Sequence, residues 1–185
     1  MVNHLWDNIF KRTSHTQDIE GILAENFLFK VLTKSELRHV QELVHYRTYK
    51  PGEAVFTQGE LGVGMYIVVS GTVNISVEDL HTLDESQRNL FITRLGRGDF
   101  FGEISLVEQA GRRTATAKAA DEVALLGFFK PDLIELTERN PKIAVKVLSR
   151  LSEVLGRRLK ETADRFTEVK RELREQMRSN EKSGS

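Results

Sequence analysis

Residues 100–106 read Phe-Phe-Gly-Glu-Ile-Ser-Leu, and residues 113–115 read Arg-Thr-Ala. The first run predicts a glycine turn that leads into one short acidic helical turn, and the second starts an Ala/Thr strand with an arginine. Backbone N–H groups at the beginning of a helix lack partners within that helix and favour an anion. Gly102 would let a ligand approach the backbone, and the guanidinium of Arg113 could hold two phosphate oxygens. The stretch therefore predicts an anion pocket.

Glu103 places an acidic side chain inside this predicted anion pocket. A carboxylate repels a bound anion unless it also accepts a hydrogen bond from the same ligand. A ligand that carries both a phosphate and hydroxyl groups therefore explains the pair of Glu103 and Arg113 better than phosphate alone.

Residues 101–106 and 113–115 together resemble the phosphate-binding cassette of cyclic nucleotide-binding domains. That family includes the bacterial catabolite activator protein and the regulatory subunits of cyclic-nucleotide-dependent kinases. Upstream segments resemble the family's first strands and turns in the same order and spacing, at residues 50–53, 58–60 and 65–73. The resemblance covers roughly residues 27–165, which is most of the chain.

The resemblance implies roles for individual residues of the cassette. Glu103 would accept a hydrogen bond from the ribose 2′-hydroxyl, and Arg113 would pair with the cyclic phosphate. The remaining cradle would consist of backbone N–H groups near Gly102, Ile104, Ser105 and Ala115.

Thr114 and Arg112 flank the phosphate-binding arginine. In family members that favour cGMP a threonine often follows this arginine, so the resemblance leans toward cGMP for Thr114 without deciding between cGMP and cAMP. Arg112 departs from the family pattern, which more often has proline or a non-basic residue there. Adjacent residues of a strand point to opposite faces, so only one of the two arginines can enter the pocket. Arg113 stands at the family's spacing, so the resemblance implies that Arg113 is the one that enters.

Four further ligand contacts are implied outside the cassette. Val73 and Leu95 stand where the family places apolar residues against ribose and base, with core packing as the alternative interpretation. Arg158 and Thr162 match an arginine and a threonine of the family's first long C-terminal helix, which approach the bound nucleotide.

Residues 46–129 show short apolar and β-branched runs separated by glycine and proline turns, which is typical of strands. The expected strands include residues 66–69, 72–77, 90–95, 114–119 and 123–129. Spacings near ten residues indicate a sandwich or a barrel. The resemblance implies a mainly β fold with helices, in which an eight-stranded jelly-roll barrel (a double-stranded β-helix) is flanked by N-terminal helices and a long C-terminal helix.

The expected organisation has four parts. They are an N-terminal helical segment at 1–45, a cyclic nucleotide-binding β-barrel at 46–130 with its cassette at 100–115, C-terminal helices at 131–178 and a disordered tail at 179–185. Within the first part, residues 1–16 predict an amphipathic helix that either packs on the domain or docks another protein. Asp18 would cap a second helix, Ser35 would open a third, and residues 78–87 would form a hairpin loop.

The C-terminal segment predicts a long helix that begins at Asn140-Pro141. From residue 155 its apolar or near-apolar positions are spaced four, three, four, three and four residues apart, at Leu155, Leu159, Thr162, Phe166, Val169 and Leu173. This is the period of a coiled coil, so we expect a homodimer through this helix. Gly156 is a weak point within it.

Composition limits the function. The chain has 27 Lys and Arg against 27 Asp and Glu, whereas a nucleic-acid binder normally has a basic excess on one face, so nucleic acid is not an expected partner. It has no cysteine, which excludes thiol chemistry and fits a reducing compartment. No apolar run approaches the roughly 18 residues of a membrane span, and no signal peptide is recognised, so we expect a cytoplasmic protein.

Two alternative functions compete with that of a nucleotide sensor. An enzyme on a cupin-like jelly roll needs several converging histidines and carboxylates, but the histidines are scattered at His4, His15, His39, His45 and His81, so we expect neither an enzyme nor a metal site. A dimerisation scaffold without a ligand is the second alternative. Loss of the ligand usually removes the cassette arginine or glutamate, and both are present here.

The output of the sensor is expected to lie outside this sequence. No helix-turn-helix, kinase or channel domain is recognised, so signal transduction would pass to an unidentified protein effector or to a second subunit. In the expected mechanism, cAMP or cGMP binding orders the C-terminal helix and changes how two subunits pack. No cofactor beyond this ligand is expected.

Overall fold

The structure of the protein, a computed structural model, describes residues 19–78 and 89–183, with side chains for residues 19–78 and 90–178. Three expectations fall outside the described residues. They are the helix at residues 1–16, the cap of the second helix at Asp18 and nearly all of the hairpin loop at 78–87. The chain divides into two compact units, Met1–Val147 and Leu148–Ser185, and each is described by itself.

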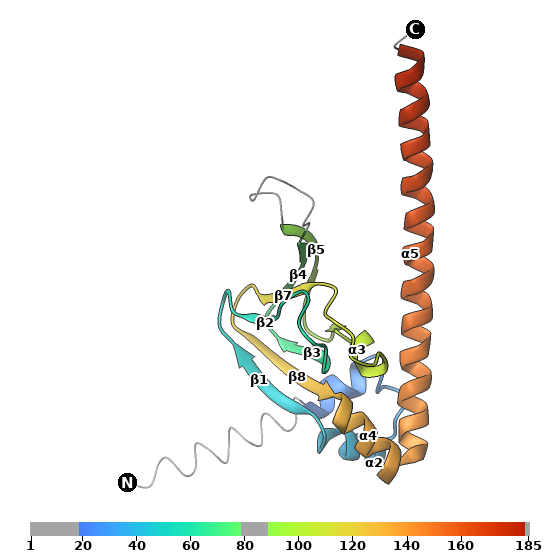
Figure 1. Cartoon of the computed structure of the whole chain (residues 1–185). Helices are drawn as coiled ribbons and strands as arrows, with labels where there is room; N and C mark the ends of the chain where they lie inside the picture. The colour runs from blue at the N-terminus through green and yellow to red at the C-terminus, as the bar shows by residue number, and fades with distance from the viewer. Residues whose placement is uncertain (1–18, 79–88, 184–185) are drawn as a thin grey trace. The chain divides into compact units, whose positions relative to one another are not determined.

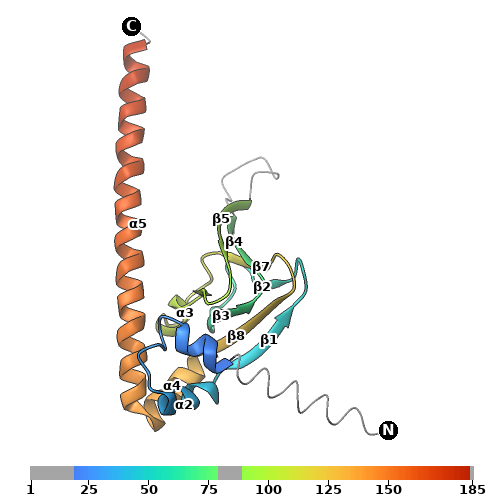
Figure 2. The ribbon, with the colours of Figure 1, turned by 180° about the vertical axis from the view of Figure 1, so that it is seen from behind.

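The first unit contains two four-stranded antiparallel sheets (Figures 1 and 2). One sheet has the order β1 (His45–Tyr49), β8 (Val123–Phe129), β3 (Gly64–Ser70) and β6 (Phe100–Phe101). The other has the order β2 (Ala54–Phe56), β7 (Thr116–Ala119), β4 (Val73–Glu78) and β5 (Asn89–Leu95). The predicted mainly β fold with flanking helices is confirmed, but among the described residues the two sheets do not close into the expected barrel.

The core of this unit lies between the two sheets and is rich in aromatic rings. The ring centroid of Phe56 lies 6.2 Å from that of Tyr66 and 5.8 Å from that of Phe101. The other buried members of the cluster are Val68, Val73, Ala117, Ala119, Val123 and Leu125. Strands β3 and β8 read as continuous apolar runs because they are buried along nearly their whole length.

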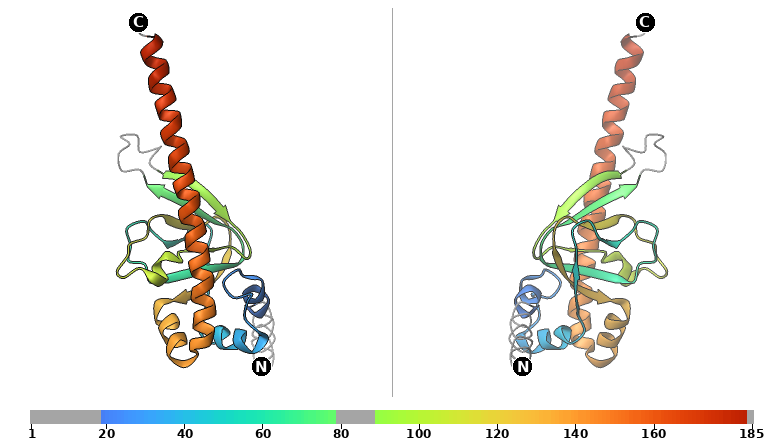
Figure 3. Two further views of the ribbon diagram at one scale, coloured as in Figure 1. Left: turned by 90° about the vertical axis from the view of Figure 1, so that its right-hand side faces the viewer. Right: turned by 90° about the vertical axis from the view of Figure 1, so that its left-hand side faces the viewer.

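Helices α2 (Lys34–Gln41) and α4 (Lys130–Arg139) lie together at one end of the sheets (Figure 3). Helix α2 begins one residue before the expected Ser35, because Thr33 and Glu36 form a capping box. Both carboxylate oxygens of Glu36 also accept hydrogen bonds from Nζ of Lys146, at 2.7 and 2.8 Å. The hydrogen bond from Lys146 lowers the pKa of Glu36 and joins α2 to the first turns of α5.

Helix α5 spans Pro141–Ser183, which is 43 residues without interruption. It begins at Pro141, as the sequence predicted. The backbone N–H groups of a first helical turn have no partner within the helix, so a proline there sacrifices no hydrogen bond. It continues five residues past the expected end at Arg178, into the segment for which disorder was expected. Gly156 does not interrupt it.

Candidate functional site

The cassette has the local structure that its sequence predicts. Strand β6 ends at Phe101, Gly102 turns the chain with φ 77°, and the four-residue helix α3 (Ile104–Val107) follows Glu103. A Cβ atom on Gly102 would lie 2.6 Å from Nη1 of Arg113, so glycine is required both by the positive φ and by the arginine. The backbone at Gly102 and the side chain of Arg113 therefore pack directly against each other.

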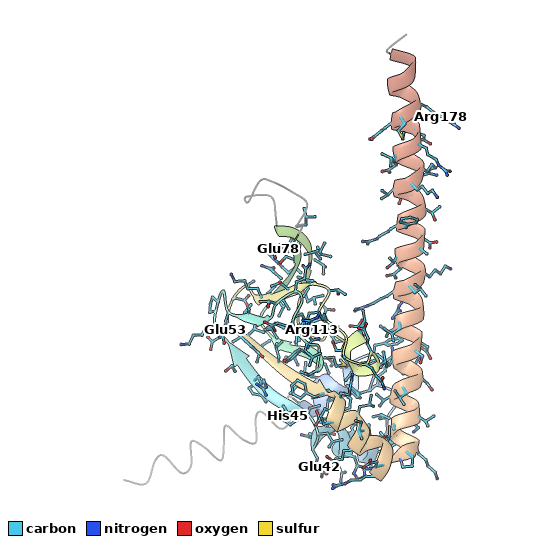
Figure 4. All side chains as sticks on the ribbon, in the orientation of Figure 1. Glu42, His45, Glu53, Glu78, Arg113 and Arg178 are labelled. Atoms are coloured by element: carbon cyan, nitrogen blue, oxygen red, sulfur yellow. The ribbon has the colours of Figure 1, made fainter. Side chains whose placement is uncertain are left out.

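Arg113 lies inside the first unit (Figure 4), where its side chain and its backbone both make contacts. Its Nη1 donates to Oγ of Ser105 at 2.9 Å and to the carbonyl oxygen of Gly102 at 3.3 Å. Its backbone N–H donates to the carbonyl oxygen of Glu60 at 2.8 Å. The guanidinium carbon lies 3.9 Å from the ring centroid of Phe56. These contacts fix the plane of a group that recognises phosphate through a planar fork of donors.

Burial dominates the electrostatics of Arg113, whose exposed fraction is 6%. Desolvation lowers the pKa of Arg113, and its electrostatic interactions with Tyr66, Glu60 and Glu103 oppose that shift. An arginine stays protonated under these conditions, so the site holds a buried positive charge. Such a charge attracts an anion with little screening by solvent.

Buried polar side chains concentrate at this place. The buried polar residues among those described are Asn26, Glu103, Ser105 and Arg113, so three of these four belong to the cassette. Glu103 is 1% exposed and Ser105 is 7% exposed. Folded proteins rarely bury polar groups without a structural or functional reason. The cluster of Glu103, Ser105 and Arg113 is therefore the candidate functional site.

The backbone of α3 differs in one respect from the prediction. The N–H of Ser105 donates to the carbonyl oxygen of Gly102 at 3.2 Å, and the N–H of Leu106 donates to that of Glu103 at 3.0 Å. The amide of Ser105 is therefore engaged within the turn rather than pointing outward without a partner. The physical reason is that so short a helix closes its first turn with tight local hydrogen bonds.

Arg112 and Thr114 are exposed, whereas Arg113 between them is buried. Nη1 of Arg112 donates to the carbonyl oxygen of Gly59 at 2.7 Å, on the surface. Arg113 is therefore the buried member of the pair, and its contact with a phosphate stays a prediction. Strand β7 begins at Thr116 rather than at Thr114, so Thr114 and the half-buried Ala115 lie in a bend before the strand.

Val73 and Leu95 are brought together, because they are direct partners in the antiparallel ladder of β4 and β5. Val73 is fully buried in the aromatic core, and Leu95 packs against that core. Both residues therefore contribute to core packing, which was the alternative to contact with ribose and base. Their contact with a nucleotide stays a prediction.

Arg158 and Thr162 belong to the second unit, where both are exposed on α5. Oγ1 of Thr162 donates to the carbonyl oxygen of Arg158 at 2.8 Å, one helical turn earlier. Their contribution to a nucleotide site stays a prediction.

Sequence reasoning missed Phe56 and Gly62. Phe56 supplies the ring on which Arg113 stacks. Gly62 leaves room for Ser105, because a Cβ atom on Gly62 would lie 2.1 Å from Oγ of Ser105. Residues 54–56 read Ala-Val-Phe, an apolar run whose pattern does not single out Phe56, and the pairing of β2 with β7 that brings it to Arg113 leaves no local signal.

Other kinds of site receive no support in residues 19–78 and 89–183. No three histidine, aspartate or glutamate side chains in these ranges are grouped so that they could hold a metal ion. Nε2 of His45 lies 3.2 Å from Oδ1 of Asp132, as part of a surface pair. None of the helices in the same ranges combines the length and the apolar character that crossing a membrane requires.

Residues 46–140 match the family model of the cyclic nucleotide-binding domain. The cyclic AMP receptor protein of Thermus thermophilus is 35% identical over 134 residues, which is 72% of this chain and 57% of that protein. A protein of Rhodopseudomonas palustris described as a potassium channel is 35% identical over 155 residues, or 82% of this chain and 36% of its own length. This chain thus spans between about a third and somewhat more than half of these relatives.

A solved structure has a similar fold. The catabolite activator protein of Thermus thermophilus superposes with a TM-score of 0.65 and 33% sequence identity. The superposition covers 75% of this chain and 60% of that chain.

Proposed function

Because the chain belongs to the cyclic nucleotide-binding domain family, we propose that it is a sensor that binds cAMP or cGMP at residues 100–115. One observation carries this proposal. A buried arginine, held by Ser105 and Gly102 and stacked on an aromatic ring, lies in the same cluster as the buried carboxylate of Glu103. This combination suits a ligand that carries a phosphate and hydroxyl groups together.

The ligand would engage the two charged residues differently. The cyclic phosphate would accept hydrogen bonds from the guanidinium of Arg113, which has five N–H donors in a fixed plane. The carboxylate of Glu103 would accept a hydrogen bond from the ribose 2′-hydroxyl. Backbone N–H groups of Gly102, Ile104 and Ala115 would complete the cradle, and that of Ser105 would have to share its proton with the carbonyl oxygen of Gly102.

The choice between cAMP and cGMP would depend on the base. Thr114 is exposed beside the buried arginine, so its hydroxyl is accessible to the exocyclic amino group of guanine. The name of the Thermus thermophilus relative refers to cyclic AMP instead. We therefore propose a cyclic purine nucleotide as the ligand class and compare both nucleotides in the test.

Transmission of the signal would use α5. Among the side chains described in the second unit, five large apolar ones of this helix are more than half exposed: Leu159, Phe166, Val169, Leu173 and Met177. Exposed apolar side chains at coiled-coil spacing favour pairing with another helix, and a second copy of the chain is the simplest partner. A nucleotide that binds one position of α5 better than another would shift the population of paired states.

A dimerisation scaffold remains the second candidate, because the exposed seam of α5 would serve it equally well. The two candidates differ in whether nucleotide stabilises the protein. A ligand at 100 times its dissociation constant adds about 2.7 kcal/mol to the free energy of unfolding. We expect cAMP, cGMP or both to raise the melting temperature of the native chain.

Two arginine variants make the thermal test specific. Arg113→Ala removes the buried guanidinium and should abolish the rise in melting temperature, whereas Arg112→Ala removes an exposed side chain and should retain it. A native chain that neither nucleotide stabilises is a scaffold. If the rise in melting temperature is lost in Arg112→Ala and kept in Arg113→Ala, Arg112 and not Arg113 binds the phosphate, and the proposed assignment is wrong.

A further inference from the structure

We propose that Gln58 is a positioning residue for Arg113. Its side-chain amide takes the place of a strand residue at the end of β4, and the segment that carries Arg113 is thereby free to leave the sheet. The inference rests on the proposed function, because Arg113 is the residue proposed to bind the phosphate. Gln58 would act through the backbone and not through contact with the nucleotide.

The ladder between β4 and β7 ends before β4 does. Its last pair joins Ser76 of β4 to Thr116 of β7. Two residues further along, Glu78 still belongs to β4, whereas β7 only begins at Thr116. Continued at the same register, the ladder would place Thr114 opposite Glu78. Thr114 lies instead in the bend that precedes β7, so the chain leaves the edge of β4 at this point.

The side chain of Gln58 occupies the position that β7 leaves. Its Oε1 accepts a hydrogen bond from the backbone N–H of Glu78 at 2.7 Å, and its Nε2 donates to the carbonyl oxygen of Glu78 at 3.4 Å. Two residues of a hydrogen-bonded antiparallel pair exchange the same two bonds. Because a side-chain amide has the donor and the acceptor of a peptide group, Gln58 satisfies both ladder groups of Glu78 without a strand residue.

The segment that leaves β4 pairs with the turn that contains Gln58. The backbone N–H of Gly59 donates to the carbonyl oxygen of Arg113 at 2.8 Å, and the N–H of Arg113 donates to the carbonyl oxygen of Glu60 at 2.8 Å. The N–H of Gln58 also donates to Oγ1 of Thr116 at 3.0 Å, where β7 begins. One turn therefore holds Arg113 through its backbone and holds the end of β4 through the side chain of Gln58.

The amide of Gln58 and the backbone of Thr114 compete for the same two groups of Glu78. A backbone group that loses its partner costs free energy comparable to a lost hydrogen bond. Without the amide, an extended β7 that pairs Thr114 with Glu78 regains both bonds. Such an extension draws residues 113–115 toward β4 and moves Arg113 away from the contacts that bury it. The amide of Gln58 thus favours the arrangement in which Arg113 stays in the candidate site.

Gln58→Met removes the amide and keeps the length of the side chain. We expect it to weaken the binding of whichever of cAMP and cGMP stabilises the native chain about tenfold, which is the effect of roughly one neutral hydrogen bond. The matched control is Asn74→Leu on β4, which removes an amide oxygen that accepts from Nε of Arg94 at 3.1 Å. It should leave the dissociation constant nearly unchanged. Isothermal titration calorimetry of the full chain measures all three proteins.

Two readouts separate positioning from a general loss of stability. The phosphorus-31 resonance of the bound nucleotide reports on the contact with Arg113, and we expect it to move toward that of free nucleotide in Gln58→Met but not in Asn74→Leu. Gln58→Asn keeps an amide on a side chain one methylene shorter, which cannot reach both groups of Glu78, so it should lose as much affinity as Gln58→Met. Native affinity in Gln58→Asn, or an unmoved phosphorus resonance in Gln58→Met, would overturn the inference.

A measurement without ligand reads the ladder directly. The amide protons of two residues in a hydrogen-bonded antiparallel pair lie close together. We therefore expect a nuclear Overhauser effect between the amide protons of Glu78 and Thr114 in Gln58→Met, and none in the native chain or in Asn74→Leu. A Gln58→Met spectrum that lacks this effect overturns the inference whether or not nucleotide binds. A native chain that neither nucleotide stabilises refutes the proposed sensor instead.

Discussion

Phe56 supports Arg113, the arginine proposed to bind phosphate, and its replacement by leucine tests that support. The guanidinium carbon of Arg113 lies 3.9 Å from the ring centroid of Phe56, in a site where Arg113 is 6% exposed. A cation over an aromatic face is stabilised by about 2 kcal/mol when both are desolvated. Leucine retains apolar volume but offers no ring face. Because each 1.4 kcal/mol is a factor of ten, we expect Phe56→Leu to weaken cyclic nucleotide binding by about 10- to 30-fold.

A matched control separates this effect from a loss of packing. Phe128 is fully buried on β8 and packs edge-on against Phe29 with centroids 5.8 Å apart, and Phe128→Leu removes a similar apolar area. Isothermal titration calorimetry at fixed ionic strength gives the dissociation constant of each variant, and urea unfolding gives its stability. Equal losses of affinity in the two variants, or no loss in Phe56→Leu, would refute the role of the ring.

Three further predictions concern other contacts of the first unit. Gly62→Ala places a Cβ atom 2.1 Å from Oγ of Ser105, and because this displaces the hydroxyl that holds the arginine, we expect titration calorimetry to show about tenfold weaker nucleotide binding. Burial raises the pKa of Tyr49 to about 12. Folding therefore favours the neutral phenol, so its contribution to the free energy of unfolding is complete below about pH 10 and is lost as the pH rises toward 12. We expect urea unfolding to show a smaller loss of stability over this pH range in Tyr49→Phe, which has no phenol to ionise. Lys146→Met removes the ammonium that Glu36 binds, in a pair whose side chains are 41% and 21% exposed, and should lower the free energy of unfolding at pH 7 by about 0.5 to 1 kcal/mol, measured in urea.

Local patterns in the sequence predicted the parts of the fold that depend on neighbouring residues. The turn at Gly102, the short helix after it and the start of α5 at Pro141 follow from backbone preferences that act within a few residues. Apolar alternation and turn residues likewise predicted most of the strands. Alternation of side chains predicted that only one of Arg112 and Arg113 would be buried, and the family's spacing indicated Arg113.

The missed contacts depend on residues that are distant in the sequence. Phe56 meets Arg113 only because β2 pairs with β7, and Gly62 meets Ser105 only because the loop that contains Gly62 packs against α3. A single sequence contains no signal for these pairings, since register is set by the whole sheet. The engaged amide of Ser105 was missed for a different reason, because a four-residue helix satisfies its own first turn.

The uninterrupted run of α5 has a mechanical consequence. From Pro141 to Arg178 the helix measures about 55 Å at 1.5 Å per residue, and helices of this kind bend only gently. A tilt of about five degrees at one end of such a rod moves its other end by about 5 Å, which is close to one helical pitch. A small change in the angle of such a helix thus becomes a displacement of its far end that is comparable to the spacing between successive turns.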